Sequence, residues 1–455
     1  MSIQNKKISI LKKKFPFTYR GVIHYYVNGK IMLGGIMPKI KLGLFGGKRG
    51  DELIRYCKYG DAEVVAVCDK DEDVIEKLKK ELKNGARYYY DFDEFIKDEN
   101  VEAVILANCA TEHAVFAIKS LHAGKHVFSE VLPCQCMKEA VELVEAVEHS
   151  GKIYAYGENY CYMPTLSEMR RLYKEGKLGE LEYAEGEYLH NVEPIWANIT
   201  YGERDHWRNF MYATFYCSHS LGPIIHVTGL RPESVVGFEV PYADRCARMG
   251  RRGAPAGVEM VTLENGAVVR SIHGCLDKFS VRYVFYGTKG RMENATEDSQ
   301  NDGVSRIYTN FDAYDGECKN NPQTYLPQHN TGIEMIDKGA HGGGDYYVIH
   351  NFVKALKGEP ADIIGVYEAM DIALPGLFAY FSILDGNKPQ QLPDLRKKEE
   401  RDKWRNDVRC ADKAVAGDKV LPSYAKYDVQ IPDKVYDSIR NKYLKNKQND
   451  DENDN

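Results

Sequence analysis

The chain has 455 residues, of which 43% are hydrophobic, and carries a formal net charge of −6 at pH 7. This length and apolar content suit two or three globular domains with well-formed cores. No apolar run approaches the ~20 residues of a membrane-spanning helix, and a negative net charge without a basic stripe argues against a nucleic-acid partner.

The two ends of the chain differ in composition from the rest. Residues 1–36 hold seven Lys or Arg and no acid, and they lack the apolar core of a secretory signal. A transit peptide would fit this composition, but we favour the hypothesis that translation starts at Met37 and that 1–36 is not native. The final NKQNDDENDN predicts a disordered acidic tail. The predicted units are therefore an extension at 1–36, domains at 37–160 and 161–395, and a C-terminal extension at 396–455.

From Ile40 the sequence alternates between strand and helix patterns. Short apolar runs, such as IKLGLF, EVVAVC and VEAVIL, are separated by segments with helical spacing, of which CMKEAVELVEAVEHSG is the longest. Repeated strand–helix units predict a parallel, Rossmann-like sheet over 37–160. Ligands of such sheets bind at the carboxyl ends of the strands.

A glycine-rich turn, LFGGKRG, follows the first of these strands. Gly46, Gly47 and Gly50 are one residue short of the G-x-G-x-x-G dinucleotide fingerprint. The turn nevertheless leads from a strand into a helix, and Asp69 ends the next strand, where a carboxylate binds ribose hydroxyls and disfavours NADP. We predict bound NAD, with Lys48 and Arg49 of the turn among its contacts; a tight turn that binds something else is the alternative.

After residue 160 the strand patterns follow one another. Asn265 and Gly266 form a predicted turn between two of them. This order predicts a C-terminal α/β domain with a large open, mostly antiparallel sheet, whose free face suits a homo-oligomer. The strands are ELEYAEGEYLHN, VEMVTLE, AVVRSIHG and VRYVFYG, and the main helices are TLSEMRRLYKEGKLG, DYYVIHNFVKALKG and VYEAMDIALPGLFAYFSIL.

Two Tyr/His pairs stand out in this second region. Tyr188 and His190 are two apart on a predicted strand and therefore share a face, with room for a ligand beside the small Ala184 and Gly186. Tyr216 and His219 are three apart at a predicted helix start, which also places them on one face. Such side chains serve as acids and bases when their pKa values shift, but each is also common as a structural residue.

Several motifs resemble the Gfo/Idh/MocA oxidoreductases. The stretch AVILANCATEHAVFAIKSLHAGKHVFSEVLP is similar to that family's strand, helix and A-G-K-H-V segment, but Val131 replaces the lysine of its E-K-P motif. A subgroup without this lysine, the NAD-dependent glycosidases of glycoside hydrolase family 109, also resembles the chain in four islands. These are ENYCY (158–162), GEYLHN (186–191), YCSHSLGP (216–223) and HGGGDYY (341–347).

The resemblance implies an enzyme that oxidises a sugar at C3 with tightly held NAD. The ketone then acidifies the C2 proton, the C1 glycosidic oxygen leaves, water adds and the hydride returns, a route that differs from two-carboxylate hydrolysis. By the same resemblance Asn108, His113 and Glu130 are further cofactor contacts, with a structural role equally open for His113. His219, Tyr188, Tyr216 and His190 are the predicted acids and bases, and Glu158 binds hydroxyls or orients a histidine.

The predicted substrate contacts are His341 and Asp345, which precede a helix that Asp345 would cap, and Trp207 and Arg208. His226 is expected in the core. A metal site built from these histidines is a third interpretation, which no H-x-H or H-x-x-x-H spacing supports, so we predict no metal. The eleven irregularly spaced cysteines predict free thiols and a cytoplasmic protein.

Two other functions remain open on the sequence. A plain NAD(P)-dependent sugar or cyclitol dehydrogenase would release its keto product and consume NAD stoichiometrically. A cofactor-binding regulatory or scaffold protein without turnover is also consistent with the missing lysine at Val131.

Overall fold

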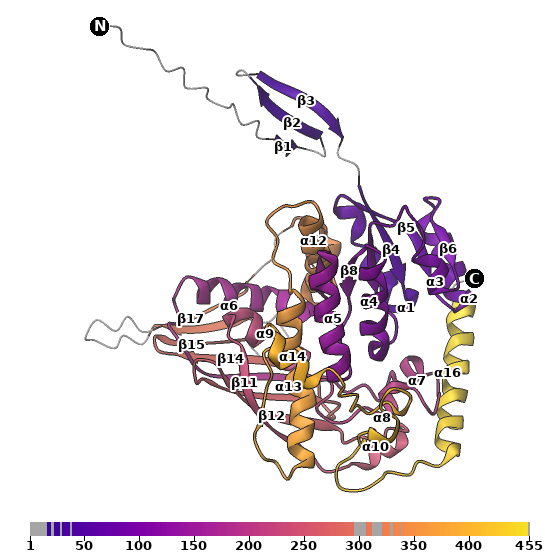
Figure 1. Ribbon diagram of the computed structural model, residues 1–455, viewed down its shortest axis with the longest axis vertical. Coiled ribbons are helices and arrows are strands. Elements are labelled where there is room, and N and C mark those ends of the chain that lie inside the picture. Colours follow the sequence, from indigo (N-terminus) through magenta and orange to yellow (C-terminus); the bar gives the residue numbers. More distant parts are fainter. Residues whose placement is uncertain are drawn as a thin grey trace.

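Three separate β-sheets organise the chain in the computed structural model (Figure 1). The structure describes residues 16–19, 22–27, 30–36, 39–294, 306–311, 321–327, 331–337 and 339–453. The two larger sheets confirm the predicted fold class, because the N-terminal one is parallel and the second is mostly antiparallel.

The N-terminal sheet has six parallel strands in the order β6-β5-β4-β7-β8-β9. All four residues of its strand β7 are buried, as expected for a parallel sheet covered on both faces. The strands are β4 (Ile40–Phe45), β5 (Ala62–Cys68), β6 (Arg87–Tyr89), β7 (Ala103–Leu106), β8 (His126–Ser129) and β9 (Tyr154–Tyr156).

Helices connect these strands and return the chain to the same edge each time. The pair α4 and α5 pack together beside the sheet (Figure 1). Asp71 caps α2 by accepting the Asp73 N–H, and α5 ends at Gly151 with a left-handed φ of 61°. The helices are α1 (Gly47–Ile54), α2 (Glu72–Leu82), α3 (Phe92–Phe95), α4 (His113–His122) and α5 (Met137–Ser150), with 3₁₀ turns η1 (Cys57–Tyr59) and η2 (Ala110–Glu112).

The second sheet has nine strands in the order β17-β16-β15-β14-β10-β13-β12-β11-β18. Only the β10–β13 pair is parallel within the described residues. The predicted Asn265–Gly266 turn joins β12 to β13, and Gly266 has a φ of 85°. The strands are β10 (Leu181–Leu189), β11 (Pro232–Glu239), β12 (Ala256–Leu263), β13 (Val268–Gly274), β14 (Ser280–Gly287), β15 (Gly290–Asn294), β16 (Ile307–Phe311), β17 (Pro322–Tyr325) and β18 (Gln390–Gln391).

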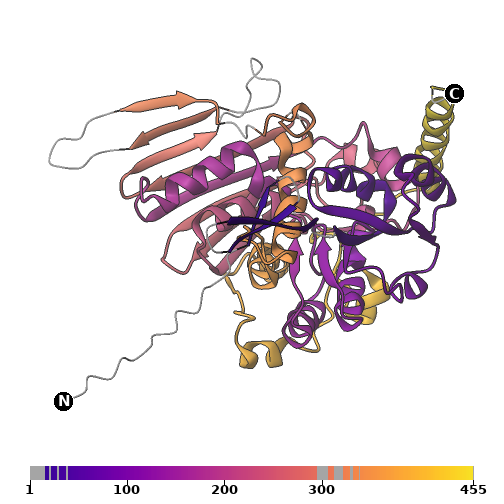
Figure 2. The ribbon, with the colours of Figure 1, turned by 90° about the horizontal axis from the view of Figure 1, so that it is seen from above.

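Helices α6, α9 and α13 pack on or beside one face of this sheet, and Figure 2 shows α6 lying along it. The helices here are α6 (Pro164–Lys174), α7 (Trp196–Thr200), α8 (Trp207–Phe210), α9 (Ser218–Thr228), α10 (Asp244–Arg248), α11 (Glu334–Asp337), α12 (Gly344–Leu356) and α13 (Val366–Leu384). The later ones are α14 (Lys398–Trp404), α15 (Lys413–Ala416) and α16 (Asp433–Asn453), and the 3₁₀ turns are η3 (Asn159–Tyr162), η4 (Ala340–Gly343) and η5 (Gly417–Lys419).

One hydrophobic core runs through both large sheets. Helix α13 contacts β11 of the second sheet and α5 of the first. Helix α12, although it lies far along the chain, packs back against β8 and α1, with the Phe352 and Phe128 rings 5.8 Å apart. The two sheets are therefore held together by shared burial, which fixes their edges relative to each other.

The ends of the chain take up structure of their own. Strands β1 (Pro16–Tyr19), β2 (Val22–Val27) and β3 (Lys30–Ile36) pair only with one another, and Met37, the predicted start, lies outside the described residues. The predicted disordered tail is instead helical as far as Asn453. Side-chain contacts explain the difference: Lys447 pairs with Asp73 of α2, and Asn446 donates to Asn198 of α7 at 2.8 Å.

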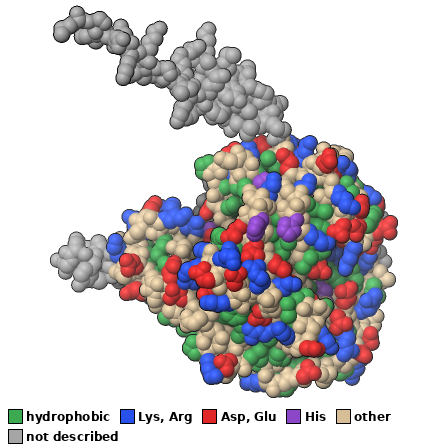
Figure 3. All heavy atoms as spheres, in the orientation of Figure 1, with side chains coloured by type: hydrophobic (Ala, Val, Ile, Leu, Met, Phe, Trp, Pro, Cys, Tyr) green, Lys and Arg blue, Asp and Glu red, His purple; other side chains and the backbone are tan. Residues whose placement is uncertain are grey.

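Acidic and basic side chains are interspersed over the face seen in Figure 3. In the part of the chain that the structure describes, no helix is both long and apolar enough to cross a membrane. The described cysteines are unpaired thiols.

Candidate active site

The glycine-rich turn packs tightly against the neighbouring strand end. Gly46 precedes α1 with a left-handed φ of 92°. A Cβ at this position would lie 2.5 Å from the backbone nitrogen of Asn108. Only glycine fits there, because any side chain would be strained and would overlap the backbone after β7.

Asp69 directly follows β5 and holds this turn in place. Its carboxylate accepts the backbone N–H of Gly47 at 2.6 Å and that of Asp71 at 2.9 Å. Beside it, the Lys48 ammonium lies 3.7 Å from Asp71 and 3.9 Å from the centre of the Tyr201 ring. The predicted Gly46, Lys48 and Asp69 thus lie together at the carboxyl ends of β4 and β5, which we call the cofactor edge.

The residues of the cofactor edge fit a bound dinucleotide. Gly46 opens the backbone at the start of α1, where a pyrophosphate would meet the N–H groups of the first turn that follow Gly47. The Asn108 side-chain oxygen is buried without a hydrogen-bond partner among the described residues, which leaves an acceptor for a ligand. Asp69 stays half-buried and can accept from ribose hydroxyls.

Arg49 and Glu130, also predicted to contact the cofactor, pair with each other. The Arg49 guanidinium lies 2.7 Å from Glu130, 2.5 Å from Glu52 and 2.7 Å from Asp345 of α12. Burial opposes the charge, but these carboxylates raise the pKa of Arg49 above its usual value. The guanidinium therefore joins the cofactor edge to α12.

His113 lies inside the protein, with 1% of its surface exposed. Its Nδ1 is 3.0 Å from the carbonyl oxygen of Leu132, and burial lowers its pKa to about 4. The neutral ring thus holds the 131–133 segment, which is the structural role left open by the sequence. Val131, in place of the family lysine, is buried in the core.

Glu158 and His219 form a buried acid–base pair. Nδ1 of His219 lies 2.6 Å from a carboxylate oxygen of Glu158. Glu158 follows β9, and His219 lies in the first turn of α9. The second carboxylate oxygen is buried without a partner among the described residues. Glu158 therefore orients the His219 ring.

Tyr188 lies on β10 and His190 directly after its end, and the two side chains meet, as their spacing predicts. The Tyr188 hydroxyl lies 3.1 Å from Nδ1 of His190, and the Tyr188 and His219 rings are 4.7 Å apart. Burial raises the pKa of Tyr188 to about 12 and lowers that of His190. A neutral His190 can therefore accept the phenol proton.

The expectation of ligand space beside Gly186 is wrong. A Cβ on Gly186 would lie 1.8 Å from the carbonyl oxygen of Ser220, so helix α9 fills that space. This close approach of α9 to β10 is what sets His219 against Tyr188.

Tyr216 lies just before α9, not within it, yet its ring centre is 5.0 Å from that of His219. Burial raises the pKa of its phenol.

Tyr160 lies at the centre of this group, although the sequence pattern does not mark it as a site residue within the ENYCY motif. Its ring contacts those of His219 at 4.5 Å, Tyr188 at 5.2 Å and His341 at 5.4 Å. It is the central ring of the group that we call the His219 cluster, which comprises Glu158, Tyr160, Tyr188, His190, Tyr216 and His219.

Asp345, a predicted substrate contact, lies fully inside the protein. It has no exposed surface, and Gly343 occupies the predicted cap position. Its carboxylate bonds Asn159 at 2.7 Å and the ring of His341 at 3.0 Å. Burial opposes ionisation, but His341 and Arg49 hold the pKa of Asp345 well below its usual value. Only the half-buried His341 of this pair remains accessible.

Trp207 and Arg208 form helix α8 close to the cluster. The Arg208 guanidinium lies 4.3 Å from the centre of the Trp207 ring, and Trp207 itself is buried.

His226, expected in the core, is buried and lies 2.7 Å from Glu368.

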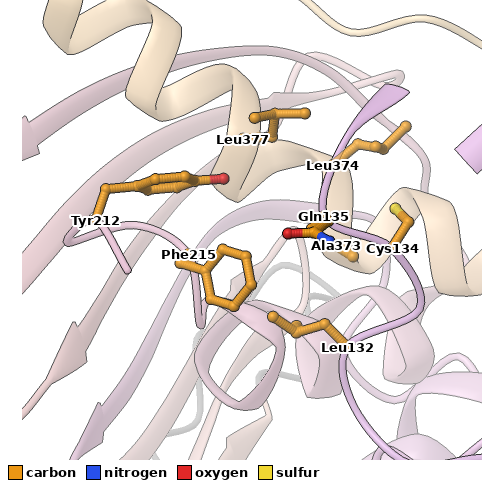
Figure 4. Close-up of a pocket in the computed structure, with 8 residues that line it drawn as sticks. All are labelled: Leu132, Cys134, Gln135, Tyr212, Phe215, Ala373, Leu374 and Leu377. Carbon is orange, nitrogen blue, oxygen red and sulfur yellow. The ribbon is translucent and has the colours of Figure 1, made fainter. Parts of the chain in front are cut away.

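The His219 cluster is open to solvent on one side, because Tyr188, His190 and Tyr216 are only partly buried. A separate small cavity is lined by Gln135, Tyr212, Phe215 and neighbouring apolar side chains, and by no residue of the cluster (Figure 4). That cavity measures about 10 Å³, which holds at most one water, and so it cannot take a sugar. Among the described residues, no three His, Cys, Asp or Glu side chains are arranged to hold a metal ion.

Two family models match the chain. Residues 40–158 match the oxidoreductase family with an NAD-binding Rossmann fold, GFO_IDH_MocA, and residues 260–405 match the C-terminal domain of glycosyl hydrolase 109. Residues 40–158 thus carry the NAD-binding domain of the Gfo/Idh/MocA oxidoreductases, and residues 260–405 resemble the C-terminal domain of the glycosyl hydrolase 109 proteins. The N-terminal sheet is accordingly an NAD(P)-binding domain, and the chain is an oxidoreductase-type enzyme, as the sequence predicts.

Similar proteins agree with this assignment. A glycosyl hydrolase family 109 protein from Solibacter usitatus is 24% identical, over 80% of this chain and 89% of that protein. An alpha-N-acetylgalactosaminidase from Shewanella oneidensis is 22% identical over 81% and 88%. An Agrobacterium radiobacter oxidoreductase, solved with NAD+, L-tartaric acid and magnesium, shares the fold at a TM-score of 0.63 and 13% identity, over 78% of this chain and 98% of that one.

Proposed function

We propose that this enzyme oxidises a glycoside at C3 and releases the group at C1 by elimination. One observation carries the proposal: two acid–base pairs, His219–Glu158 and Tyr188–His190, lie in ring contact beside an NAD(P)-binding edge. A simple alcohol oxidation needs one base, whereas oxidation followed by elimination needs two. The relatives of the glycosyl hydrolase 109 type support this choice over a plain dehydrogenase.

The first pair moves the hydroxyl proton. A bound nicotinamide supplies a hydride acceptor for the sugar carbon. His219 takes the proton of the same alcohol, and Glu158 stabilises the imidazolium that results because its carboxylate lies 2.6 Å away. Packing against Tyr160 at 4.5 Å holds the ring in place.

The second pair removes the proton next to the new ketone. Tyr188 is protonated at rest, since burial raises its pKa to about 12. It therefore acts as a base only if His190 accepts the phenol proton at the same time, and the two atoms are 3.1 Å apart. Elimination of the C1 oxygen, addition of water to the unsaturated ketone and return of the hydride to C3 would then complete the reaction without a second carboxylate, unlike in ordinary glycosidases.

The proposed cofactor is NAD rather than NADP. Asp69 directly follows β5, where a carboxylate accepts from ribose hydroxyls and repels a 2′-phosphate. We expect Asp69→Ala to weaken NAD binding at least tenfold and NADP binding less, measured by calorimetry on the stripped protein. An equal loss for both dinucleotides would contradict the role of Asp69.

Deuterium labelling separates the glycosidase from the dehydrogenase. In deuterated water, we expect the released sugar to carry deuterium at C2 while no reduced nicotinamide accumulates. Reduced nicotinamide formed in a one-to-one ratio with a keto product would favour the dehydrogenase. Retained NAD with no absorbance change on adding any sugar would favour a non-catalytic protein.

Association through the open sheet and a cytoplasmic location stay predictions. The free face of the sheet carries charged pairs, such as Arg270–Glu185 at 2.8 Å and Arg282–Glu293 at 3.0 Å. Light scattering on the purified protein would give the number of copies.

A further inference from the structure

Arg208 lies beside the His219 cluster and has no counter-ion among the described residues. Its side chain is half-buried and stacks on the buried Trp207 at 4.3 Å. In the described part of the chain, no Asp or Glu oxygen lies within 4.0 Å of its guanidinium, and its side chain makes no hydrogen bond there. Burial without an anion is costly for a guanidinium, and it lowers the pKa of Arg208.

The groups around Arg208 include a second cation. The titratable groups that act most on it are the phenols of Tyr216, Tyr188 and Tyr201 and the guanidinium of Arg251. Arg251 is buried and bonds only peptide oxygens, those of Gly253 and Ala254, with no carboxylate nearby among the described residues. A second cation thus adds to the field at Arg208.

His190 is placed in the same field. The charges that act on it come from His219, His341 and Arg208, and all of them disfavour a further proton. The two carboxylates behind these rings are already engaged, because Glu158 bonds His219 and Asp345 bonds His341 and Arg49. Among the described residues, neither of these carboxylates pairs with Arg208.

We infer that the substrate carries an anionic group, a carboxylate or a sulfate or phosphate ester, which pairs with Arg208. This inference rests on the proposed function for the identity of the ligand as a sugar. A planar guanidinium binds two oxygens of such a group at once, and the Trp207 ring fixes its plane. The anion also repays the burial of Arg208, which a neutral sugar does not.

Calorimetric titration of the NAD-loaded enzyme with matched sugars tests the inference. The panel pairs galactose and glucose with their uronates, 6-sulfates and 6-phosphates. We expect at least one acidic sugar to bind about 10- to 100-fold tighter than its neutral counterpart. A preference for uronates identifies a carboxylate, and a preference for the esters identifies a tetrahedral anion.

Arg208→Met should abolish this preference and Arg208→Lys should keep part of it, because lysine retains the charge but not the paired donors. Arg252→Met is the matched control, since Arg252 is a nearby half-buried arginine that has an acid, Asp205, at 3.9 Å. Its preference should equal that of the unaltered enzyme. Thermal unfolding and NAD content of each variant show whether it is folded and loaded.

Three outcomes would overturn the inference. The first is equal binding of neutral and acidic sugars, or no binding of either. The second is loss of NAD from a folded Arg208→Met variant, which would assign the guanidinium to the cofactor phosphates. The third is an Arg208→Met variant that keeps the preference for acidic sugars but shifts the pH dependence of binding equally for both sugar classes. That result would mean that Arg208 acts on the Tyr188 phenol and not on the substrate. A binding preference without deuterium exchange or reduced nicotinamide would instead refute the proposed function alone.

Discussion

The cofactor edge and the His219 cluster lie side by side but are assembled differently. At the cofactor edge, Gly46, Asp69 and Asn108 each follow the end of a neighbouring parallel strand. The His219 cluster instead draws its members from η3, β10 and the start of α9, which are distant in sequence. The first kind of site follows from local pattern, and the second depends on how helices pack across a sheet.

This difference separates binding from chemistry. Changes at the cofactor edge should affect stability and NAD content together, because its residues shape the backbone. Changes in the His219 cluster should affect turnover with NAD retained, because its side chains project from elements that remain packed.

The largest effect is expected from His219→Gln. Glutamine can still donate to Glu158 but cannot take up a proton, so turnover should fall by about 10²- to 10⁴-fold. Steady-state kinetics with NAD content and melting temperature as controls would measure this. A rate near that of the unaltered enzyme would remove His219 from the proposed chemistry.

Tyr188→Phe should impair removal of the C2 proton while leaving removal of the hydroxyl proton intact. We expect oxidation of the sugar to persist, seen as reduced nicotinamide on the enzyme, while deuterium exchange at C2 falls by about 10²-fold or more. Loss of both signals together would show that the two pairs do not act separately.

Gly46→Ala should damage the cofactor edge. The left-handed φ of 92° and the 2.5 Å approach of a Cβ to the Asn108 backbone predict a loss of about 3 kcal/mol in the free energy of unfolding. Chemical denaturation of the protein and its NAD content provide the measurement. Full stability with normal NAD content would contradict the tight turn.

The smallest effect concerns the pH dependence of the link between the two regions. The folded-state pKa of Asp345 is depressed, so its stabilisation is present above its unfolded pKa near 4 and is lost as pH falls below it. The pKa of His341 is raised, so its contribution to the free energy of unfolding is present below about pH 6.5 and is lost as pH rises above that value.

The difference in unfolding free energy between the unaltered protein and Asp345→Asn should therefore shrink by about 1–2 kcal/mol as pH falls from 5 to 3. Denaturation curves across this range would show it. A constant difference would mean that the ion pairs of Asp345 with Arg49 and His341 add no pH-dependent stability.

The order of strands and helices, the cofactor edge and the Tyr188–His190 pair could all be predicted from the sequence. Apolar runs mark buried strands, parallel strands bring their carboxyl ends to one edge, and residues two apart on a strand share a face. Each of these rules acts over a short stretch of chain or follows from the topology, so these features can be predicted without knowing how distant elements pack.

Only the tertiary structure decided how the distant parts meet. Gly186 admits helix α9 rather than a ligand, and this contact sets His219 against Tyr188. The return of α12 to β8 buries Asp345 among Arg49, Asn159 and His341, which no local pattern indicates. The central position of Tyr160 also depends on tertiary packing. Close packing between elements determines which side chains touch, and the periodicity of a single element does not.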